Sequence, residues 1–282
     1  MYKIGIVIPS YNQGIYLERA LLSILKQRCV RLSIVIMDGG STDNSLDIIR
    51  KYQEKLLYVR SHKDTGQAAA INEGMEHLVH CDYVCWLNSD DIFLGEDTLY
   101  KAADFLEKHK QFPALYGKAK IIDGNDAYIK DYQTYVFSRK QLAKECFICQ
   151  PASMIRRCAW DLAGGLNPKL FMCMDYDLWW RLSEQGDLVY LPIYLAASRE
   201  HEYSKTSQYQ IENFLEVFKV LKTYRGYVPF SWIRNKIFFE RFILFKRRKS
   251  FINKMFVQFN AYLFFIIQFI CFEIILEENK KS

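Results

Sequence analysis

Four short apolar segments alternate with helix-like stretches in the first ninety residues, and this alternation constrains the fold more than any other feature. The segments cover residues 3–8, 32–37, 56–59 and 82–87. The stretches between them place apolar side chains at helical spacing. Continuously apolar strands that alternate with helices predict an α/β protein, in which a mostly parallel sheet is covered by helices on both faces.

A polar cluster follows each apolar segment at its carboxyl end. The clusters are Pro9-Ser10-Tyr11-Asn12, Asp38-Gly39-Gly40-Ser41, Asp64-Thr65-Gly66-Gln67 and Asn88-Ser89-Asp90-Asp91. Any one of them is equally typical of a turn or a helix cap. However, the carboxyl ends of parallel strands meet at one edge of a sheet, and α/β proteins bind ligands there. Their shared position therefore predicts a binding site at that edge.

Asp90 and Asp91 are adjacent acids directly beyond an apolar strand, where they would repel each other and lose hydration. A divalent cation relieves both problems, and it can also bridge carboxylates to an anionic diphosphate. We therefore expect Mn²⁺ or Mg²⁺ at these two residues. The alternative is a structural one, in which either acid caps a helix around residues 93–105.

The pattern after residue 91 is more mixed. Residues 114–122 and 127–135 predict a hairpin, residues 175–184 a helix, and residues 188–197 another strand. The body is expected to finish near Thr206. The predicted domains are therefore residues 1–206 and a helical extension of residues 207–282.

Taken together, the clusters resemble the nucleotide-sugar glycosyltransferases of family 2, which have the GT-A fold, a Rossmann-like sheet flanked by helices. The resemblance covers about residues 3–206. For the nucleotide, it implies a base and ribose pocket lined by Pro9, Ser10, Tyr11 and Asn12, a contact between Asp38 and the base, and a closing segment that contains Asp64 and Gln67.

The same resemblance implies the positions of the diphosphate and the metal. Asn88-Ser89-Asp90-Asp91 is similar to the family's acidic metal motif, although Asn88 stands where many members have Asp. Asp90 and Asp91 are thus implied as metal ligands, with Asp90 also beside the nucleotide. The segment from Arg199 to Thr206 resembles a closing motif, which implies that Arg199 and Lys205 contact the diphosphate and that His201 binds the metal or a phosphate. The alternative is that His201 is structural and that the two cations are solvated surface charges.

Residues 172–181 resemble the family's acid-bearing helix, which implies that Asp175 is the catalytic base. Met174 stands where the family usually has Glu. Helical spacing alone does not distinguish Asp175 from Asp177, because residues two apart point to different faces of a helix. Whichever acid does not face the sugar is expected to pair with a cation such as Arg181.

The resemblance implies an inverting, metal-dependent enzyme that uses a nucleoside-diphosphate sugar, with UDP favoured. Its acceptor would be a hydroxyl of a glycan or a lipid-linked molecule, in surface polysaccharide assembly. The alternative is an inactive relative that binds nucleotide or organises an assembly at the membrane. A dinucleotide oxidoreductase is disfavoured, because no GxGxxG follows the first strand.

The C-terminal segment differs in composition from the body. Residues 219–254 hold eleven Lys or Arg and one acid, a net charge of +10, whereas the whole chain carries +6. Residues 255–276 are mostly apolar and long enough to cross a bilayer. They could lie on a membrane surface, span it, or pack in the body or a homodimer. We expect a cytoplasmic protein, peripheral at the inner face of the cell membrane, with no nucleic-acid partner.

Overall fold

The computed structural model describes residues 1–247, with side chains as far as Arg241. Its internal contacts divide the chain into one unit of residues 1–232 and a second unit from residue 233 onward.

The strands are β1 (Tyr2–Ser10), β2 (Val30–Asp38), β3 (Tyr58–Ser61), β4 (Tyr83–Trp86), β5 (Ile92–Phe93), β6 (Ala114–Ile122), β7 (Tyr128–Asp131), β8 (Ser153–Arg156) and β9 (Val189–Arg199). The helices are α1 (Gly14–Leu25), α2 (Ser45–Lys51), α3 (Gln67–Glu76), α4 (Thr98–Lys108), α5 (Arg139–Lys144), α6 (Arg157–Ala163), α7 (Met174–Gln185), α8 (Lys205–Gln208), α9 (Gln210–Arg225) and α10 (Phe230–Arg247), with short 3-10 turns η1 (Gln53–Lys55) and η2 (Gln150–Ala152).

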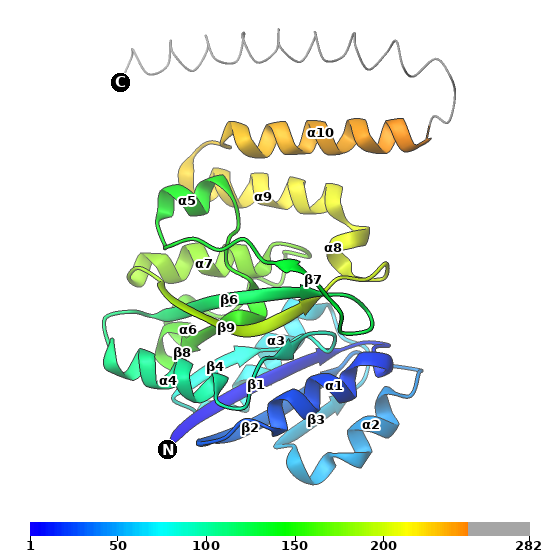
Figure 1. Cartoon of the computed structure of the whole chain (residues 1–282), viewed down its shortest axis with the longest axis vertical. Coiled ribbons are helices and arrows are strands. Elements are labelled where there is room, and N and C mark those ends of the chain that lie inside the picture. Colours follow the sequence, from blue (N-terminus) through cyan, green and yellow to red (C-terminus); the bar gives the residue numbers. More distant parts are fainter. Residues whose placement is uncertain (248–282) are drawn as a thin grey trace, which may run out of the picture. The chain divides into compact units, whose positions relative to one another are not determined.

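One half of the sheet is parallel, with the strand order β3-β2-β1-β4 (Figure 1). These strands come from the four apolar segments of the sequence. Their register pairs Ser10 with Asp38, and Asp38 in turn with Ser61. The carboxyl ends of three neighbouring strands are therefore level, and the polar residues that follow them share one edge.

The sheet continues from β4 through β8, β6, β9 and β5. Strand β8 is antiparallel to both β4 and β6, whereas β9 is parallel to β6. Strand β9 therefore runs in the same direction as β1 and β4, and its last residue, Arg199, reaches the same edge of the sheet. This half is mixed rather than parallel. The predicted hairpin over residues 114–135 is confirmed by the antiparallel pairing of β6 with β7.

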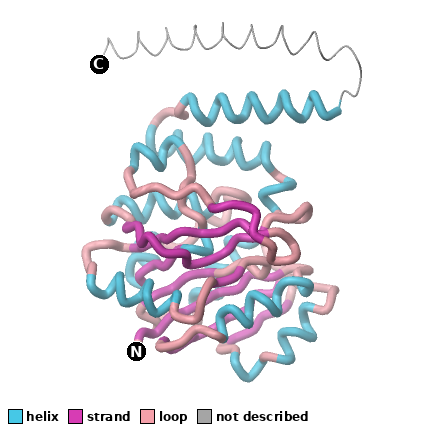
Figure 2. Tube along the Cα trace, viewed as in Figure 1, coloured by secondary structure: helices cyan, strands magenta, loops and turns pink. Residues whose placement is uncertain are grey.

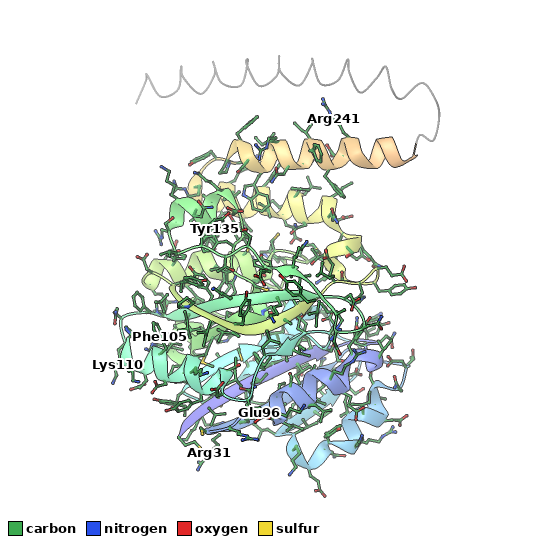
Figure 3. All side chains as sticks on the ribbon, viewed as in Figure 1. Arg31, Glu96, Phe105, Lys110, Tyr135 and Arg241 are labelled. Atoms are coloured by element: carbon green, nitrogen blue, oxygen red, sulfur yellow. The ribbon has the colours of Figure 1, made fainter. Side chains whose placement is uncertain are left out.

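Alternate strand residues build one core on each face of the sheet. Ile4, Ile6 and Ile8 pack with α1, α2 and α4, whereas Val7 and Trp86 pack with α3, α6, α7 and α9. Figure 2 shows helices on both sides of the strands, and the side chains in Figure 3 fill the space between these layers. Burial on both faces explains why the strands are continuously apolar in sequence.

Helix α9 belongs to the first unit, because its residues Val217, Val220 and Leu221 are at most 3% exposed and join the core that contains α7. The contacts divide the chain after Trp232, and the expected domain boundary at residue 206 stays a prediction. No helix within residues 1–247 is both long and apolar enough to span a membrane. The expected membrane segment, residues 255–276, lies outside the described residues.

Gly74 allows α3 to approach the sheet closely, because a Cβ there would lie 2.8 Å from Val7 Cγ1 and 2.9 Å from Met37 Cγ. We expect Gly74→Ala to lower the free energy of unfolding by about 1 to 3 kcal/mol through overpacking, although Ala favours helix. Urea denaturation measures this change. Glu76→Ala, at an exposed position of the same helix, is the control. Equal midpoints for Gly74→Ala and the native protein would contradict the close packing.

Candidate functional site

A cleft with a volume of about 900 Å³ opens at the edge of the sheet where β1, β2, β4 and β9 end. It lies within residues 1–232. The predicted site residues on its wall are Pro9, Ser10, Tyr11, Asp64, Gln67, Asp90, Asp91, Asp175, Arg199 and Lys205. Asp38 and His201 are not on this wall but contact Gly40 and Asp90, which are, and Asn12 contacts Ser41 next to it. The structure thus brings together groups that are almost 200 residues apart in sequence.

Asp38 is fully buried at the end of β2. Its carboxylate accepts hydrogen bonds from the backbone N–H of Gly40 (3.0 Å), from that of Ser41 (2.9 Å) and from the hydroxyl of Ser61 (2.7 Å). These bonds satisfy the charge and fix a turn in which Gly40 has a φ of +86°, a conformation that suits glycine. Asp38 therefore stabilises the loop that follows β2. The expected contact of Asp38 with a nucleobase stays a prediction.

Asn12 ties the loop after β1 to the loop after β2. Its backbone N–H donates to Ser41 Oγ (2.8 Å), and its Oδ1 accepts from the N–H of Thr42 (2.8 Å). Asn12 is left-handed, with a φ of 51°, which asparagine tolerates better than most residues. The neighbouring Tyr11 is 63% exposed and lines the cleft, where its ring is free to stack on a base or ribose.

The two adjacent acids after β4 have different environments. Asp91 is 2% exposed, and its carboxylate accepts from the backbone N–H of Arg199 (2.9 Å) and from Asn88 Nδ2 (3.0 Å). Burial, and then the neighbouring charge of Asp90, raise the pKa of Asp91 to about 7. Asp90 lines the cleft, and its Oδ2 lies 3.1 Å from His201 Nε2.

The side chains of Asp90 and His201 offer ligand atoms that fit a divalent cation. A carboxylate oxygen and an imidazole nitrogen meet beside the cleft, and Tyr16 packs against the His201 ring at a centroid distance of 4.9 Å. Within residues 1–241, no cluster of three or more His, Cys, Asp or Glu side chains could hold a metal by itself. Magnesium and related ions commonly take one or two protein ligands and complete their shell with substrate phosphates and water. Of the expected ligands, Asp90 and His201 are the pair that meets, whereas the Asp91 carboxylate is bonded inside the protein.

Arg199 is 4% exposed and joins three segments at the end of β9. Its Nε donates to the carbonyl of Asp90 (2.8 Å), and its guanidinium also donates to the carbonyl of Asp123 (2.6 Å) and pairs with the Asp126 carboxylate. The guanidinium lies 4.8 Å from the centre of the Tyr16 ring. In this arrangement Arg199 holds in place the loop of residues 88–91, called the acidic loop below. The expected contact of Arg199 with a diphosphate stays a prediction.

The first turn of α7 carries Asp175 and Asp177 into different surroundings. Asp175 lines the cleft, and burial raises its pKa to about 6. Asp177 is 6% exposed, lies 2.7 Å from an Arg181 nitrogen, and accepts a hydrogen bond from the Tyr224 hydroxyl (2.9 Å). The expected pairing of Asp177 with Arg181 is thus confirmed. Of the two acids, Asp175 is the one placed to act on a molecule in the cleft.

A chain of hydrogen bonds crosses the cleft from α8 to the acidic loop. Lys205 Nζ donates to Gln67 Oε1 (2.9 Å), Gln67 Nε2 donates to Asn88 Oδ1 (2.9 Å), and Asn88 in turn donates to Asp91. Burial lowers the pKa of Lys205 to about 8. Asn88, the first residue of the acidic motif, therefore connects Gln67 to Asp91 through its side-chain amide.

Some residues at the site carried no signal in the sequence. Gln150, from η2, is 8% exposed and donates to the carbonyl of Trp86 (2.8 Å), directly before the acidic loop. Glu216, on α9, accepts hydrogen bonds from the loop that leads into α7. Neither belongs to a motif, so only the three-dimensional fold identifies them. Asp64 was predicted, and it accepts from the N–H of Gly66 (3.0 Å) at the start of α3.

The chain is similar in sequence to several glycosyltransferases. Residues 5–161 match the sequence profile of the family described as glycosyl transferase family 2. The chondroitin synthase of Escherichia coli is 32% identical over 186 residues, which is 65% of this chain and 27% of that protein. A PGL/p-HBAD biosynthesis glycosyltransferase of Mycobacterium bovis is 29% identical over 203 residues, covering 70% of this chain and 76% of that protein. The chain therefore spans about a quarter of the chondroitin synthase.

The fold is also found in solved structures. The TarS 1–349 fragment of S. aureus in complex with UDP-GlcNAc has a TM-score of 0.62 and 19% identity, covering 79% of this chain and 67% of that one. The mannosyltransferase PcManGT from Pyrobaculum calidifontis in complex with GDP-Man and Mn²⁺ has a TM-score of 0.59 and 16% identity, covering 78% and 63%. On the match over residues 5–161 and this shared architecture, the chain belongs to glycosyl transferase family 2 and has the GT-A fold.

Proposed function

We propose that this protein transfers a sugar from a nucleoside-diphosphate donor, most simply a UDP-sugar, to a hydroxyl group of a glycan or lipid-linked acceptor. The observation that carries the proposal is that Asp90 and Asp175 line one cleft and that His201 is bonded to the Asp90 carboxylate. Solved relatives of the fold hold UDP-GlcNAc, or GDP-Man with Mn²⁺, and sequence relatives include chondroitin and hyaluronan synthases. These similarities support a role in polysaccharide or glycan assembly.

In the proposed reaction, an acceptor oxygen attacks the anomeric carbon, and the bond from that carbon to the phosphate oxygen breaks. Asp175 takes the proton of the acceptor hydroxyl, which makes the oxygen a better nucleophile. With a single displacement the anomeric configuration inverts. Asp90 and His201 would hold the divalent cation, which supplies Lewis-acid stabilisation of the departing diphosphate. Lys205 adds a positive charge at the cleft wall on the same side as Asp175.

We further propose that the enzyme works in the cytoplasm at the inner face of the cell membrane. The support is the composition of the C-terminal segment, with its net charge of +10 over residues 219–254 and the apolar residues 255–276 that follow. Basic residues next to an apolar stretch favour the anionic inner leaflet. Self-association into a homodimer through the same segment is the alternative use of this apolar surface.

A panel of UDP- and GDP-linked sugars tests the reaction directly, with released nucleotide as the readout in Mn²⁺, in Mg²⁺ and in EDTA. We expect metal-dependent release from one donor, and a fall of about 10²- to 10³-fold for Asp90→Asn. Asp187→Asn, at an exposed position outside the cleft, is the control. Undiminished release in EDTA would contradict the metal-dependent reaction. Calorimetric binding of UDP with no turnover of any donor would instead favour the inactive relative.

Paired substitutions in α7 separate the proposed base from its neighbour. Asp175→Asn is expected to reduce transfer by about 10²- to 10⁴-fold, because the acceptor hydroxyl loses its proton acceptor, while the unfolding midpoint stays close to that of the native protein. Asp177→Asn is expected to lower the free energy of unfolding by about 1.5 to 3 kcal/mol, because it weakens charged hydrogen bonds with Arg181 and Tyr224. Steady-state kinetics and thermal melts of both variants measure this contrast. The reverse pattern would assign the base to Asp177.

The pKa values of two cleft residues predict a bell-shaped dependence of kcat/KM on pH. Asp175 must be ionised to accept a proton, so activity should fall as the pH drops through about 6. Lys205 must be protonated to stabilise a diphosphate, so activity should also fall as the pH rises through about 8. Lys205→Met should remove the alkaline limb and keep the acidic one. An alkaline limb that persists in Lys205→Met would show that another group causes it.

A further inference from the structure

The loop that leads into α7 is held by a carboxylate from a distant part of the chain. Glu216 Oε1 accepts the backbone N–H of Phe171 (2.8 Å), and its Oε2 accepts those of Met172 (2.7 Å) and Cys173 (2.9 Å). Three successive amides thus converge on one side chain. Hydrogen bonds to an ionised acceptor are about twice as strong as those between neutral groups, so this contact fixes the loop where α7 begins.

Glu216 is itself firmly placed. The next residue on α9, Val217, is 2% exposed, and it packs in the same core as α7. One turn earlier, Asn213 Oδ1 lies 3.1 Å from the sulfur of Cys173, so a second side chain of α9 contacts the same loop. The carboxylate is therefore presented by a helix that is packed against α7, not by a mobile surface segment.

The anchored loop ends two residues before Asp175. Cys173 is the residue that precedes α7, and Asp175 lies in the first turn, where its Oδ1 accepts the N–H of Tyr176 (2.8 Å). The direction in which this turn leaves the loop decides where the Asp175 carboxylate stands in the cleft. A displacement of about 1 Å at a reacting group can reduce a rate by roughly a hundredfold. The anchoring of this loop is thus a condition for placing Asp175.

We propose that Glu216 is a positioning residue for the reaction, and that α9 belongs to the functional site although it contributes no group to the chemistry. The role of Asp175 on which this inference rests is that of the proposed function. The anchoring by Glu216 does not depend on it. It follows that residues beyond 206 are needed for an intact active site.

Hydrogen exchange resolved to single amides tests the anchoring without any substrate. In Glu216→Ala, we expect protection to fall at least tenfold at Phe171, Met172 and Cys173. Protection should also fall at Tyr176, whose N–H reports the position of the Asp175 carboxylate. Glu212→Ala, exposed one turn earlier on α9, is the matched control and should leave these amides unchanged. Unchanged exchange at these four amides in Glu216→Ala would overturn the proposal.

Kinetics on the full chain separate positioning from general loss of structure. For Glu216→Ala we expect kcat for nucleotide-sugar turnover to fall at least tenfold, with KM for the donor within twofold of the native value. Glu216→Gln keeps one acceptor oxygen and should recover part of the rate. A fall in kcat matched by weaker UDP binding and a lower melting midpoint would also overturn the proposal. If the native protein turns over no donor, the proposed function fails, and the exchange experiment still decides the role of Glu216.

Discussion

Asp91 joins the end of β4 to the end of β9, and the arrangement of the site depends on this contact. A buried carboxylate is costly unless its oxygens are bonded, and here one oxygen accepts from the backbone of Arg199 and the other from Asn88. Because Asp91 is bonded inside the protein, its neighbour Asp90 is directed to the cleft. The same contact fixes the start of the segment that carries His201 and Lys205. Asp90 and Asp91 are adjacent and chemically identical, yet their surroundings differ. Asp91 is bonded within the protein, whereas Asp90 lines the cleft.

Much of the fold could be predicted from the sequence, because its signals are local. Each parallel strand is a short apolar run followed by a polar cluster, and burial on both faces makes such runs recognisable. The hairpin of β6 and β7 was predictable for a different reason, because a turn of polar residues separates two strand-like runs. The packing of α9 could not be predicted in this way. Composition changes from residue 219, within α9, but the packing of α9 depends on contacts with α7 that no local pattern encodes.

The site was predictable where its residues follow strands, and unpredictable where it depends on contacts across the fold. Helical spacing does not distinguish Asp175 from Asp177. In the structure Tyr224 and Arg181 bond to Asp177, whereas Asp175 lines the cleft, and the role of Asp175 as the base stays a prediction. Glu216 and Gln150 resemble ordinary polar residues in sequence, because what distinguishes them is the backbone that they meet. Asn12 and Asp38 lie at the predicted edge of the sheet, but they form hydrogen bonds with the loops after β1 and β2.

The origin of the cleft in two separate stretches of chain has a consequence for how such proteins diversify. Most lining residues come either from the loops after β1, β2, β3 and β4 or from the end of β9 and the starts of α7 and α8. Exposed positions of α7 and α9 that make none of the contacts to Asp175 or Glu216 can therefore vary while the loops after the parallel strands stay unaltered. Under the proposed function, a lineage of this architecture would acquire a new acceptor preference through such positions and retain the donor used by its ancestor.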